Sequence, residues 1–375
     1  MVTISLCMIV KNEEAILSRC LKSVTSAVDE IIIVDTGSSD NTKAIAAEFT
    51  DKIYNFEWID DFSAARNFAY SKATMDYQMW LDADDVLPPE SCKKLLELKG
   101  NLPPTVDIVT MKYNTHFDEY GVPVFTSTRE RLTRRERGYR WQDPVHECIP
   151  LVGNIVHTDI VIHHRKPQNS IQKPSNRNLE IYNNLERRTK ILTPRQQYYF
   201  ARELKDHKNW HKSAYYFEKF LNSGKGWIED NISACFNLAI CYNSLGDNDK
   251  ALSTLRESFA FDSPRAEICS EIGYHYKRDH NFQVALRWFK IAASLDLPDS
   301  KGFILPDYYG YIPNIEACVC CCELGEFKIA ETYNERAAIY KPNSPAVKNN
   351  RVILARLNII DSDEVDSDSS GNTMV

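Results

Sequence analysis

The sequence lacks several features that would assign it to familiar classes of protein. No apolar run in its 375 residues approaches the ~20 residues that a membrane-spanning helix needs. The apolar segment 1–10 has no basic residues before it, which makes it a poor signal peptide. The eleven cysteines lack the two separated C-x-x-C pairs of a zinc ribbon. We therefore expect a cytoplasmic protein with reduced cysteines and no stable membrane insertion.

The sequence also lacks an excess of basic residues. Its formal net charge is −7, and five acidic residues lie in the tail, so the rest of the chain carries a charge of about −2. Because nucleic-acid binding depends on clustered positive charge, we expect no nucleic-acid partner. The tail, 359–375, is acidic and rich in serine, and this composition predicts disorder.

The first third of the chain alternates between strand and helix patterns. Helices are predicted for 13–27, 41–49 and 63–73, buried strands for 3–10 and 30–35, and two further strands for 52–56 and 77–81. Strands joined by helices predict a parallel sheet, whose ligands bind at the carboxyl ends of the strands. Asp35 and Asp82 both fall at such ends.

The second half is helical from about residue 177 to 357 and contains a weak repeat. Short polar turns are each followed by an alanine, at Ala214, Ala251, Ala285 and Ala330. The middle spacing, 34 residues, is the period of tetratricopeptide repeats, and the longer last spacing indicates an insertion around 298–313. The alternative is a plain helical bundle. The composition places the domain boundaries at 1–175, 176–358 and 359–375.

The strongest local signal is Asp82-Ala83-Asp84-Asp85, which follows the apolar Met79-Trp80-Leu81. Carboxylates crowded at a strand end repel one another unless a divalent cation lies among them. The alternative is an acidic surface turn. Asp35, at another strand end, can accept a hydrogen bond from a nucleobase N–H, whereas Asp40 reads better as a helix cap.

Four segments resemble glycosyltransferase family 2, in the family's order and spacing: 5–14, 31–40, 61–67 and 80–85. Val145-His146-Glu147, with Trp141 before it, resembles an element of one subgroup in which tetratricopeptide repeats follow the catalytic domain. That subgroup includes enzymes that glycosylate bacteriocin peptides on cysteine or serine. The resemblance implies an α/β GT-A domain with a mostly parallel sheet, followed by an all-α repeat domain. It also implies a nucleoside-diphosphate sugar donor, usually a UDP-sugar, and inversion at the anomeric carbon.

The same resemblance assigns the donor site. Asp35 would read the base, Asp84 would bind Mn²⁺ or Mg²⁺, and Asp82 would contact the ribose or the metal. Arg66 would neutralise base-side or diphosphate charge, because its planar fork matches phosphate oxygens. Further residues of the matched motifs are expected in the donor pocket: Val10, Asn12, Glu13 and Ala83.

The remaining assignments leave alternatives open. Inversion needs a general base, for which Glu147 is the first candidate and Asp143 and His146 follow. Relatives more often have glycine where this chain has Asp143, so the assignment of the base is open. Three further residues have two interpretations each. His164 is either a metal ligand or part of a surface histidine pair, and Arg131 and Arg134 either bind phosphate or belong to a solvated basic run.

Three functions follow from these features. The first is transfer of a sugar to a peptide or protein held by the repeats. The second keeps the enzyme but replaces that acceptor with a glycan or a lipid-linked saccharide. The third is an interaction protein with an inactive transferase domain, which the intact Asp35, Asp82 and Asp84 argue against. Because repeat faces can pair between chains, a homodimer is a further expectation.

Overall fold

The computed structural model describes residues 1–117, 123–166, 176–189, 191–298 and 305–369. Contacts divide the chain into two compact units, Met1–His207 and Lys208–Val375. Helices α5 (Asn176–Thr189) and α6 (Pro194–Asp206) therefore belong with the sheet, whereas the composition places a boundary after residue 175. The physical reason is that side chains of both helices contact residues 143–146: the hydroxyl of Tyr182 on α5 donates to the carbonyl of Val145, and Gln196 on α6 donates to Asp143.

The first unit is built on a sheet whose described strands lie in the order β3-β2-β1-β4-β7-β6-β8-β5. Their bounds are β1 Ile4–Val10, β2 Glu30–Asp35, β3 Ile53–Asn55, β4 Tyr77–Trp80, β5 Asp85–Val86, β6 Ile108–Phe117, β7 Pro123–Arg134 and β8 Ile155–His164. Strands β3, β2, β1 and β4 pair in parallel, and β7 joins β4 in the antiparallel sense. The α/β class with a mostly parallel sheet is confirmed.

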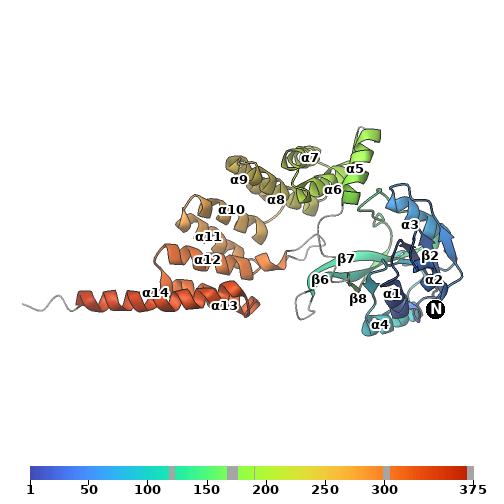
Figure 1. Ribbon diagram of the computed structural model, residues 1–375, viewed down its shortest axis with the longest axis horizontal. Helices are drawn as coiled ribbons and strands as arrows, with labels where there is room; N and C mark the ends of the chain where they lie inside the picture. Colours follow the sequence, from blue (N-terminus) through green and yellow to red (C-terminus); the bar gives the residue numbers. More distant parts are fainter. Residues whose placement is uncertain (118–122, 167–175, 190, 299–304, 370–375) are drawn as a thin grey trace, which may run out of the picture. The chain divides into compact units, whose positions relative to one another are not determined.

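Helices cover both faces of this sheet (Figure 1). On one face lie α1 (Leu17–Val24), α2 (Thr42–Ala47) and α4 (Pro89–Asn101), packed on Leu6 and Met8 of β1. On the other face lies α3 (Phe62–Ser71), which packs on alternate residues of the same strands. β1 and β2 are buried on both faces, which explains why they read as continuous apolar runs. A short 3-10 helix, η1 (Arg135–Arg137), follows β7.

The second unit consists of helices that pair in antiparallel fashion along the chain. They are α7 Trp210–Asn222, α8 Ile228–Ser244, α9 Asn248–Glu257, α10 Ala266–Arg278, α11 Phe282–Ala293, α12 Tyr311–Glu323, α13 Phe327–Tyr340 and α14 Pro345–Ser369, with short 3-10 turns η3 Ser258–Ala260 and η4 Pro306–Tyr308. The repeat alanines are buried, with Ala285 and Ala330 completely inaccessible, because helices meet closely at these positions. This helical domain resembles tetratricopeptide repeats, as the sequence predicts.

The turns of these repeats share one backbone feature. Gly246, His280 and Gly325 each precede a second helix of a pair, and each has a positive φ, of 81°, 57° and 76°. Glycine suits this left-handed conformation, and histidine tolerates it at a cost. The common geometry confirms that the polar turns found in the sequence are equivalent.

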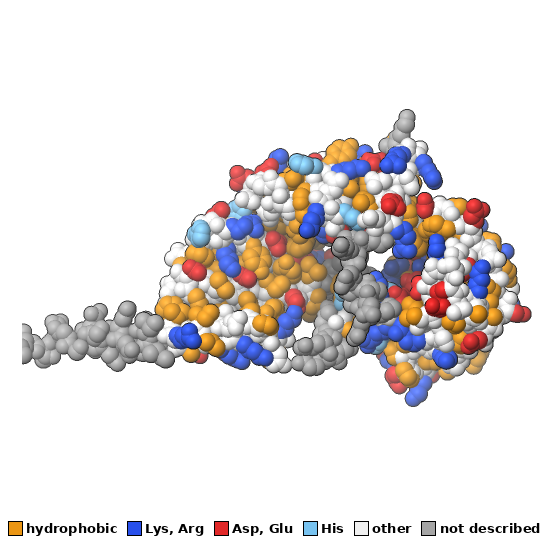
Figure 2. Space-filling model, viewed as in Figure 1, with side chains coloured by type: hydrophobic (Ala, Val, Ile, Leu, Met, Phe, Trp, Pro, Cys, Tyr) orange, Lys and Arg blue, Asp and Glu red, His pale blue; other side chains and the backbone are white. Residues whose placement is uncertain are grey.

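Four features of the chain complete the description. Helix α14 continues to Ser369, whereas the sequence predicts disorder from 359; residues 370–375 lie outside the described residues. The predicted insertion contains η4, and its residues 299–304 also lie outside them. Within the part of the chain that the structure describes, no helix is long and apolar enough to cross a bilayer. Basic and acidic side chains are interspersed on the face shown in Figure 2.

Candidate active site

The carboxyl ends of the parallel strands bring the predicted donor residues to one edge of the sheet. Val10, the last residue of β1, is in register with Asp35, the last residue of β2. Asp82 follows the neighbouring strand β4 by two residues. This edge is where open α/β sheets bind their ligands.

Asp35 is buried and held by the turn that follows it. Its Oδ1 accepts hydrogen bonds from the backbone N–H groups of Gly37 and Ser38, each at 3.0 Å, and Lys43 Nζ lies 3.4 Å away. Burial raises the pKa of Asp35, but the hydrogen bonds from Ser38 and Gly37 outweigh it and lower the pKa. Among the described residues, the buried Oδ2 has no hydrogen-bond partner. A buried carboxylate oxygen of this kind requires a donor.

The loops after β1 and β2 are tied together beside Asp35. Asn12, which has a positive φ of 56°, donates from its backbone N–H to Ser38 Oγ at 2.9 Å. Its side-chain Oδ1 accepts from the N–H of Ser39 at 2.8 Å. Asp40 accepts from the N–H of Thr42 at 3.0 Å, but the N-cap residue of α2 is Asn41 and not Asp40.

Glu13 faces the acidic residues that follow β4. Burial raises the pKa of Glu13 to about 7, and the negative charges of Asp84 and Asp82 add to the shift. Its backbone N–H donates to Thr42 Oγ1 at 2.7 Å, which fixes the start of this loop. Glu13 therefore belongs to the same cluster of negative charge as Asp82 and Asp84.

Asp85 is the buried anchor of the acidic segment. Its Oδ2 accepts from Arg131 Nη1 at 3.1 Å and from the backbone N–H of Asp82 at 3.0 Å. Its Oδ1 accepts from the hydroxyl of Tyr113 at 2.8 Å. Since Asp85 is completely buried and both its oxygens are used, it shapes the turn that presents Asp82 and Asp84. Ala83, between them, is buried.

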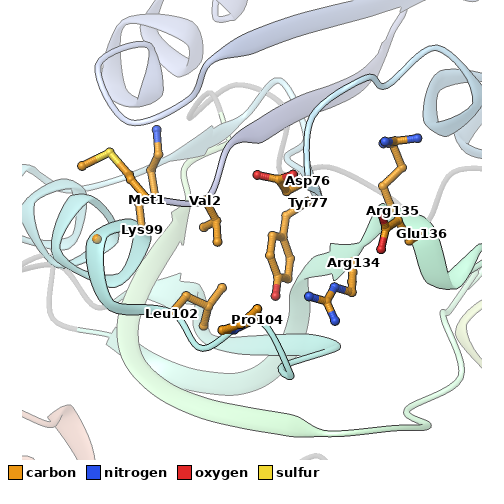
Figure 3. Close-up of a pocket in the computed structure, with 11 residues that line it drawn as sticks. Met1, Val2, Asp76, Tyr77, Lys99, Leu102, Pro104, Arg134, Arg135 and Glu136 are labelled. Atoms are coloured by element: carbon orange, nitrogen blue, oxygen red, sulfur yellow. The ribbon is translucent and has the colours of Figure 1, made fainter.

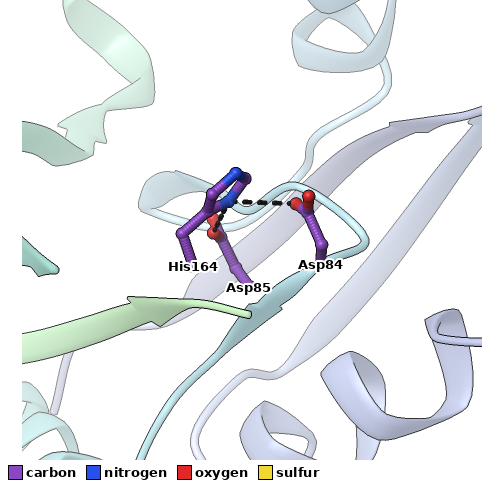
Figure 4. Close-up of side chains that lie close together, drawn as sticks. All are labelled: Asp84, Asp85 and His164. Carbon is purple, nitrogen blue, oxygen red and sulfur yellow. Dashed lines mark hydrogen bonds and ion pairs between the residues drawn. The ribbon is translucent and has the colours of Figure 1, made fainter. Parts of the chain in front are cut away.

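His164 reaches the same segment from the last residue of β8, which is in register with Asp85 of β5. Its Nδ1 lies 3.1 Å from Asp84 Oδ1 and 3.2 Å from Asp85 Oδ1 (Figure 4). Burial lowers the pKa of His164, but the hydrogen bonds and charges of the two aspartates outweigh it and raise the pKa to about 9. The hydroxyl of Tyr113 also lies 2.8 Å from Nδ1.

The three side chains Asp84, Asp85 and His164 present ligand atoms that all lie within 4.8 Å of one another. Because both carboxylate oxygens of Asp85 already accept hydrogen bonds, Asp84 and His164 are the two side chains that could coordinate a cation. Carboxylate oxygens are the ligands of Mg²⁺ and Mn²⁺, and a histidine nitrogen is a common metal ligand. This donor set fits a divalent cation.

Arg66 connects the acidic segment to the first candidate base. Its Nη2 donates to Asp82 Oδ1 at 2.7 Å, and its Nε donates to Glu147 Oε1 at 2.6 Å. The guanidinium lies 5.0 Å from the ring centre of Trp80 and 4.9 Å from that of Trp141. Burial raises the pKa of Asp82, but the charge and hydrogen bond of Arg66 outweigh it and lower the pKa to about 2.

The other two candidate bases point away from Arg66. Asp143 Oδ1 accepts from Gln196 Nε2 at 2.8 Å, and His146 Nε2 lies 2.8 Å from Glu203 Oε1. Both partners belong to α6. Of the three candidates, the structure brings Glu147 alone to Arg66 and Asp82.

The two candidate phosphate-binding arginines occupy different places. Arg131 is completely buried, bonded to Asp85 and stacked 3.6 Å from the ring centre of Trp80. Arg134 pairs with Tyr77, the first residue of β4, and therefore lies at the opposite edge of the sheet. There it lines a separate cavity of about 370 Å³ (Figure 3). The structure does not bring Arg134 to the acidic segment, and phosphate binding by Arg131 stays a prediction.

The family model of glycosyl transferase family 2 matches residues 5–152, which contain the acidic segment and Glu147. This region is a glycosyltransferase family 2 domain.

Two curated relatives each match part of this chain. A TPR repeat-containing protein of Synechococcus elongatus is 42% identical over 151 residues, 40% of this chain and 36% of that protein. The SPbeta prophage-derived glycosyltransferase SunS of Bacillus subtilis is 29% identical over 234 residues, 60% of this chain and 54% of that protein. The matched regions thus span about a third and about half of these relatives.

Solved structures give more distant likenesses. TarS of S. aureus is 12% identical and matches 69% of this chain and 91% of that chain, with a TM-score of 0.39. A thermophilic TPR protein of Thermus thermophilus is 14% identical and matches 49% of this chain and 90% of that chain, with a TM-score of 0.36. Likenesses at this level carry no conclusion about this chain.

The glycosyltransferase domain contains site residues that the sequence patterns did not single out. Tyr113, in the middle of β6, joins Asp85 to His164. Arg195, Gln196 and Glu203 of α6 contact Asp143 and His146, next to Glu147. The local patterns of these residues are those of ordinary strands and helices, and no periodicity distinguishes a core aromatic residue from one that orients a charge.

Proposed function

We propose that this chain transfers a sugar, with inversion, from a UDP-sugar to a peptide or protein acceptor held partly by the helical repeats. The observation that carries the proposal is the convergence of Asp84 and His164, 3.1 Å apart, at the strand edge that also holds Asp35. Asp35, at the end of β2, suits the base of a nucleoside diphosphate. Asp84, after β4, and His164, at the end of β8, together suit its phosphates.

Asp35 recognises the base in this proposal. Its buried Oδ2 needs a donor, and the N–H of a uracil ring supplies one. Loss of that hydrogen bond would leave the oxygen buried and unsatisfied, which costs about 1–3 kcal/mol. Val10, Asn12 and Glu13 lie beside Asp35, at the end of β1 and in the loop after it, and would contribute to the donor site.

Asp84 and His164 would hold a divalent cation, Mn²⁺ or Mg²⁺, with Asp82 as the third ligand. When bound, the cation offsets the negative charge of the donor diphosphate. Mg²⁺ prefers oxygen ligands and retains water, so the imidazole of His164 favours Mn²⁺. Asp85, Tyr113 and the backbone of the turn keep this pair in place.

Glu147 acts as the general base in this mechanism. Inverting transfer requires removal of a proton from the acceptor as its nucleophile attacks the sugar. Arg66 binds Glu147 through Nε and Asp82 through Nη2, so one rigid, stacked guanidinium fixes the base relative to the donor-side carboxylate. Asp143 and His146 hold the loop that carries this base.

The acceptor class rests on the sequence resemblance to peptide glycosyltransferases and on the repeats. Transfer to a glycan or lipid-linked saccharide is the second candidate, and transfer to membrane extracts but never to proteins would favour it. A third candidate, an inactive interaction protein, requires that UDP and UDP-sugars fail to bind in the presence of Mn²⁺. A cytoplasmic location and a homodimer formed through the repeats stay predictions.

A donor screen and one variant test the proposal. UDP-glucose, UDP-galactose and their N-acetylated forms are incubated with the full chain and Mn²⁺, and released UDP is measured. We expect turnover with at least one donor and a loss of at least ~100-fold in Asp84→Ala, because a lost electrostatic contact to the reacting charge has this size. Glu90→Gln, an exposed carboxylate on α4, is the matched control. Metal-dependent turnover of Asp84→Ala at the wild-type rate would refute the proposal.

A further inference from the structure

The loop 141–149, which we call the Glu147 loop, is held on its inner side by α3. Asn67 donates to the carbonyl of Trp141 at 3.0 Å and accepts from its N–H at 2.9 Å. The backbone N–H of Phe62 donates to the carbonyl of Pro144 at 2.8 Å. Arg66 then binds the carboxylate of Glu147 itself. These contacts place the loop over the acidic segment.

The outer side of the Glu147 loop is held by α6. Arg195 Nη2 donates to the carbonyl of His146 at 3.1 Å, and Arg195 Nε lies 3.3 Å from Asp143 Oδ2. Glu203 Oε1 lies 2.8 Å from His146 Nε2. The imidazole also stacks on the ring of Tyr199, with centres 4.6 Å apart. Two turns of one helix therefore fix the two residues that flank Pro144 and Val145.

α5 supports the same contact. Asn178 Nδ2 donates to Glu203 Oε1 at 3.1 Å, and the ring of Tyr182 lies parallel to that of His146. Burial raises the pKa of Glu203, but the hydrogen bond and charge of His146 outweigh it and lower the pKa. Glu203 is thus a buried, ionised acceptor with two donors directed at it.

The backbone of the Glu147 loop needs this support. Asp143 and His146 have positive φ values of 71° and 54°, which side chains other than glycine rarely adopt. His146 is the residue directly before Glu147. A strained residue next to a functional side chain keeps its conformation only when surrounding contacts impose it. In their absence, the loop would relax and the carboxylate of Glu147 would move.

We propose that Arg195 and Glu203 are positioning residues that hold the left-handed backbone at His146 and so aim Glu147 at the acceptor. They act through the loop, because Arg195 contacts Asp143 and His146 and Glu203 contacts His146. This inference rests on the proposed function, in which Glu147 is the base. It predicts that α6 determines the rate of proton removal while the donor site, built by β1, β2 and β4, is unaffected.

The main test compares Glu203→Ala with Glu203→Gln in the full chain. We expect Glu203→Ala to lower kcat by roughly 10- to 100-fold, since a displacement of about 1 Å can cost that much. The KM for the sugar nucleotide should stay within about twofold. Glu203→Gln keeps an acceptor oxygen for His146 and should recover most of the rate. Asp206→Asn, an exposed carboxylate on the same helix, is the matched control.

A double-mutant cycle separates positioning from a general loss of structure. In the Glu147→Gln background, Glu203→Ala should have no further effect on the residual rate, because the group that it positions has lost its function. Arg195→Lys, which keeps the charge but loses the planar fork, serves as a second variant if Glu203→Ala does not fold. Amide hydrogen exchange should rise in residues 141–149 of both variants and not in residues 30–40.

Three results would overturn the inference. The first is a kcat of Glu203→Ala and Arg195→Lys equal to that of Asp206→Asn. The second is an equal loss of rate in the wild-type and Glu147→Gln backgrounds. Either result leaves the proposed function intact. The third is a wild-type protein without any sugar-nucleotide turnover, which overturns the proposed function and this inference together.

Discussion

Arg131 provides the most direct test of how the acidic segment is held. It forms an ion pair with Asp85 in which both side chains are completely inaccessible to solvent. Its guanidinium also lies 3.6 Å from the ring centre of Trp80 and 4.3 Å from that of Tyr113. Replacing Arg131 by Met keeps much of its length and removes its charge. Asp85 would then remain as a buried carboxylate without its cation.

The expected loss of stability is large. Breaking a buried ion pair by removing one partner typically costs 3–5 kcal/mol, because the remaining charge is uncompensated. Removing both charges in Arg131→Met/Asp85→Asn leaves no buried charge, so we expect the double variant to lose at least about 2 kcal/mol less than the sum of the single losses. The alternative role for Arg131, phosphate binding, predicts a different result: weaker UDP binding at nearly unchanged stability.

Urea unfolding of the full chain, followed by circular dichroism, measures these differences. Arg134→Met is the matched control, because Arg134 lies on the same strand at the opposite edge of the sheet. We expect its effect to stay within about 0.5–1 kcal/mol. If Arg131→Met were as stable as Arg134→Met, the buried pair would not be what holds the acidic segment, and the interpretation of Asp85 as an anchor would be wrong.

Two further predictions test other parts of the structure. Burial raises the pKa of Glu30, but hydrogen bonds from Lys52, Ser5 and Thr74 outweigh it and lower the pKa from 4.5 to about 2. This stabilisation is complete above pH 4.5 and declines as the pH falls toward 2. In urea unfolding, Glu30→Gln should therefore lower the free energy of unfolding by about 2–3 kcal/mol at pH 7 and by less than half of that at pH 3. A loss that does not depend on pH would contradict this prediction. In the repeats, Gly325→Ala should lower the free energy of unfolding in urea by about 1 kcal/mol, because alanine is strained at the positive φ of this turn. His280→Gly, at the equivalent turn, should not lower it, because glycine adopts the same φ without strain. Equal losses in the two variants would refute the shared turn geometry.

Much of the fold follows from local patterns in the sequence. The four strands predicted in the first third became β1 to β4. β1 and β2 were the clearest, because strands buried on both faces need continuous apolar side chains. Asp35 and Asp82 could be placed at one edge since parallel strands end together. The repeat alanines were identifiable because close helix packing requires a small residue at a fixed spacing.

The parts that could not be predicted depend on contacts between distant segments. Glu147 meets Arg66 across 81 positions, and His146 meets Glu203 across 57. No local pattern records such a pairing, so the sequence left Asp143, His146 and Glu147 as alternatives. The domain boundary could not be predicted for the same reason. Helices α5 and α6 have the helical pattern of the repeats, and only their contacts with distant residues such as Asp143 and His146 join them to the first unit.

The pairing of β5 with β8 has a thermodynamic consequence. His164 lies 79 positions beyond Asp85 in the sequence, so it joins Asp84 only when β8 has docked beside β5. A cation bound by this pair would stabilise the completed sheet and would have little affinity for any state in which β8 is detached. By linkage, the stabilisation is RT ln(1 + [M]/Kd), about 2.7 kcal/mol at 100 times Kd. The midpoint of thermal unfolding, measured against Mn²⁺ concentration, would then report metal affinity without any knowledge of the sugar or the acceptor.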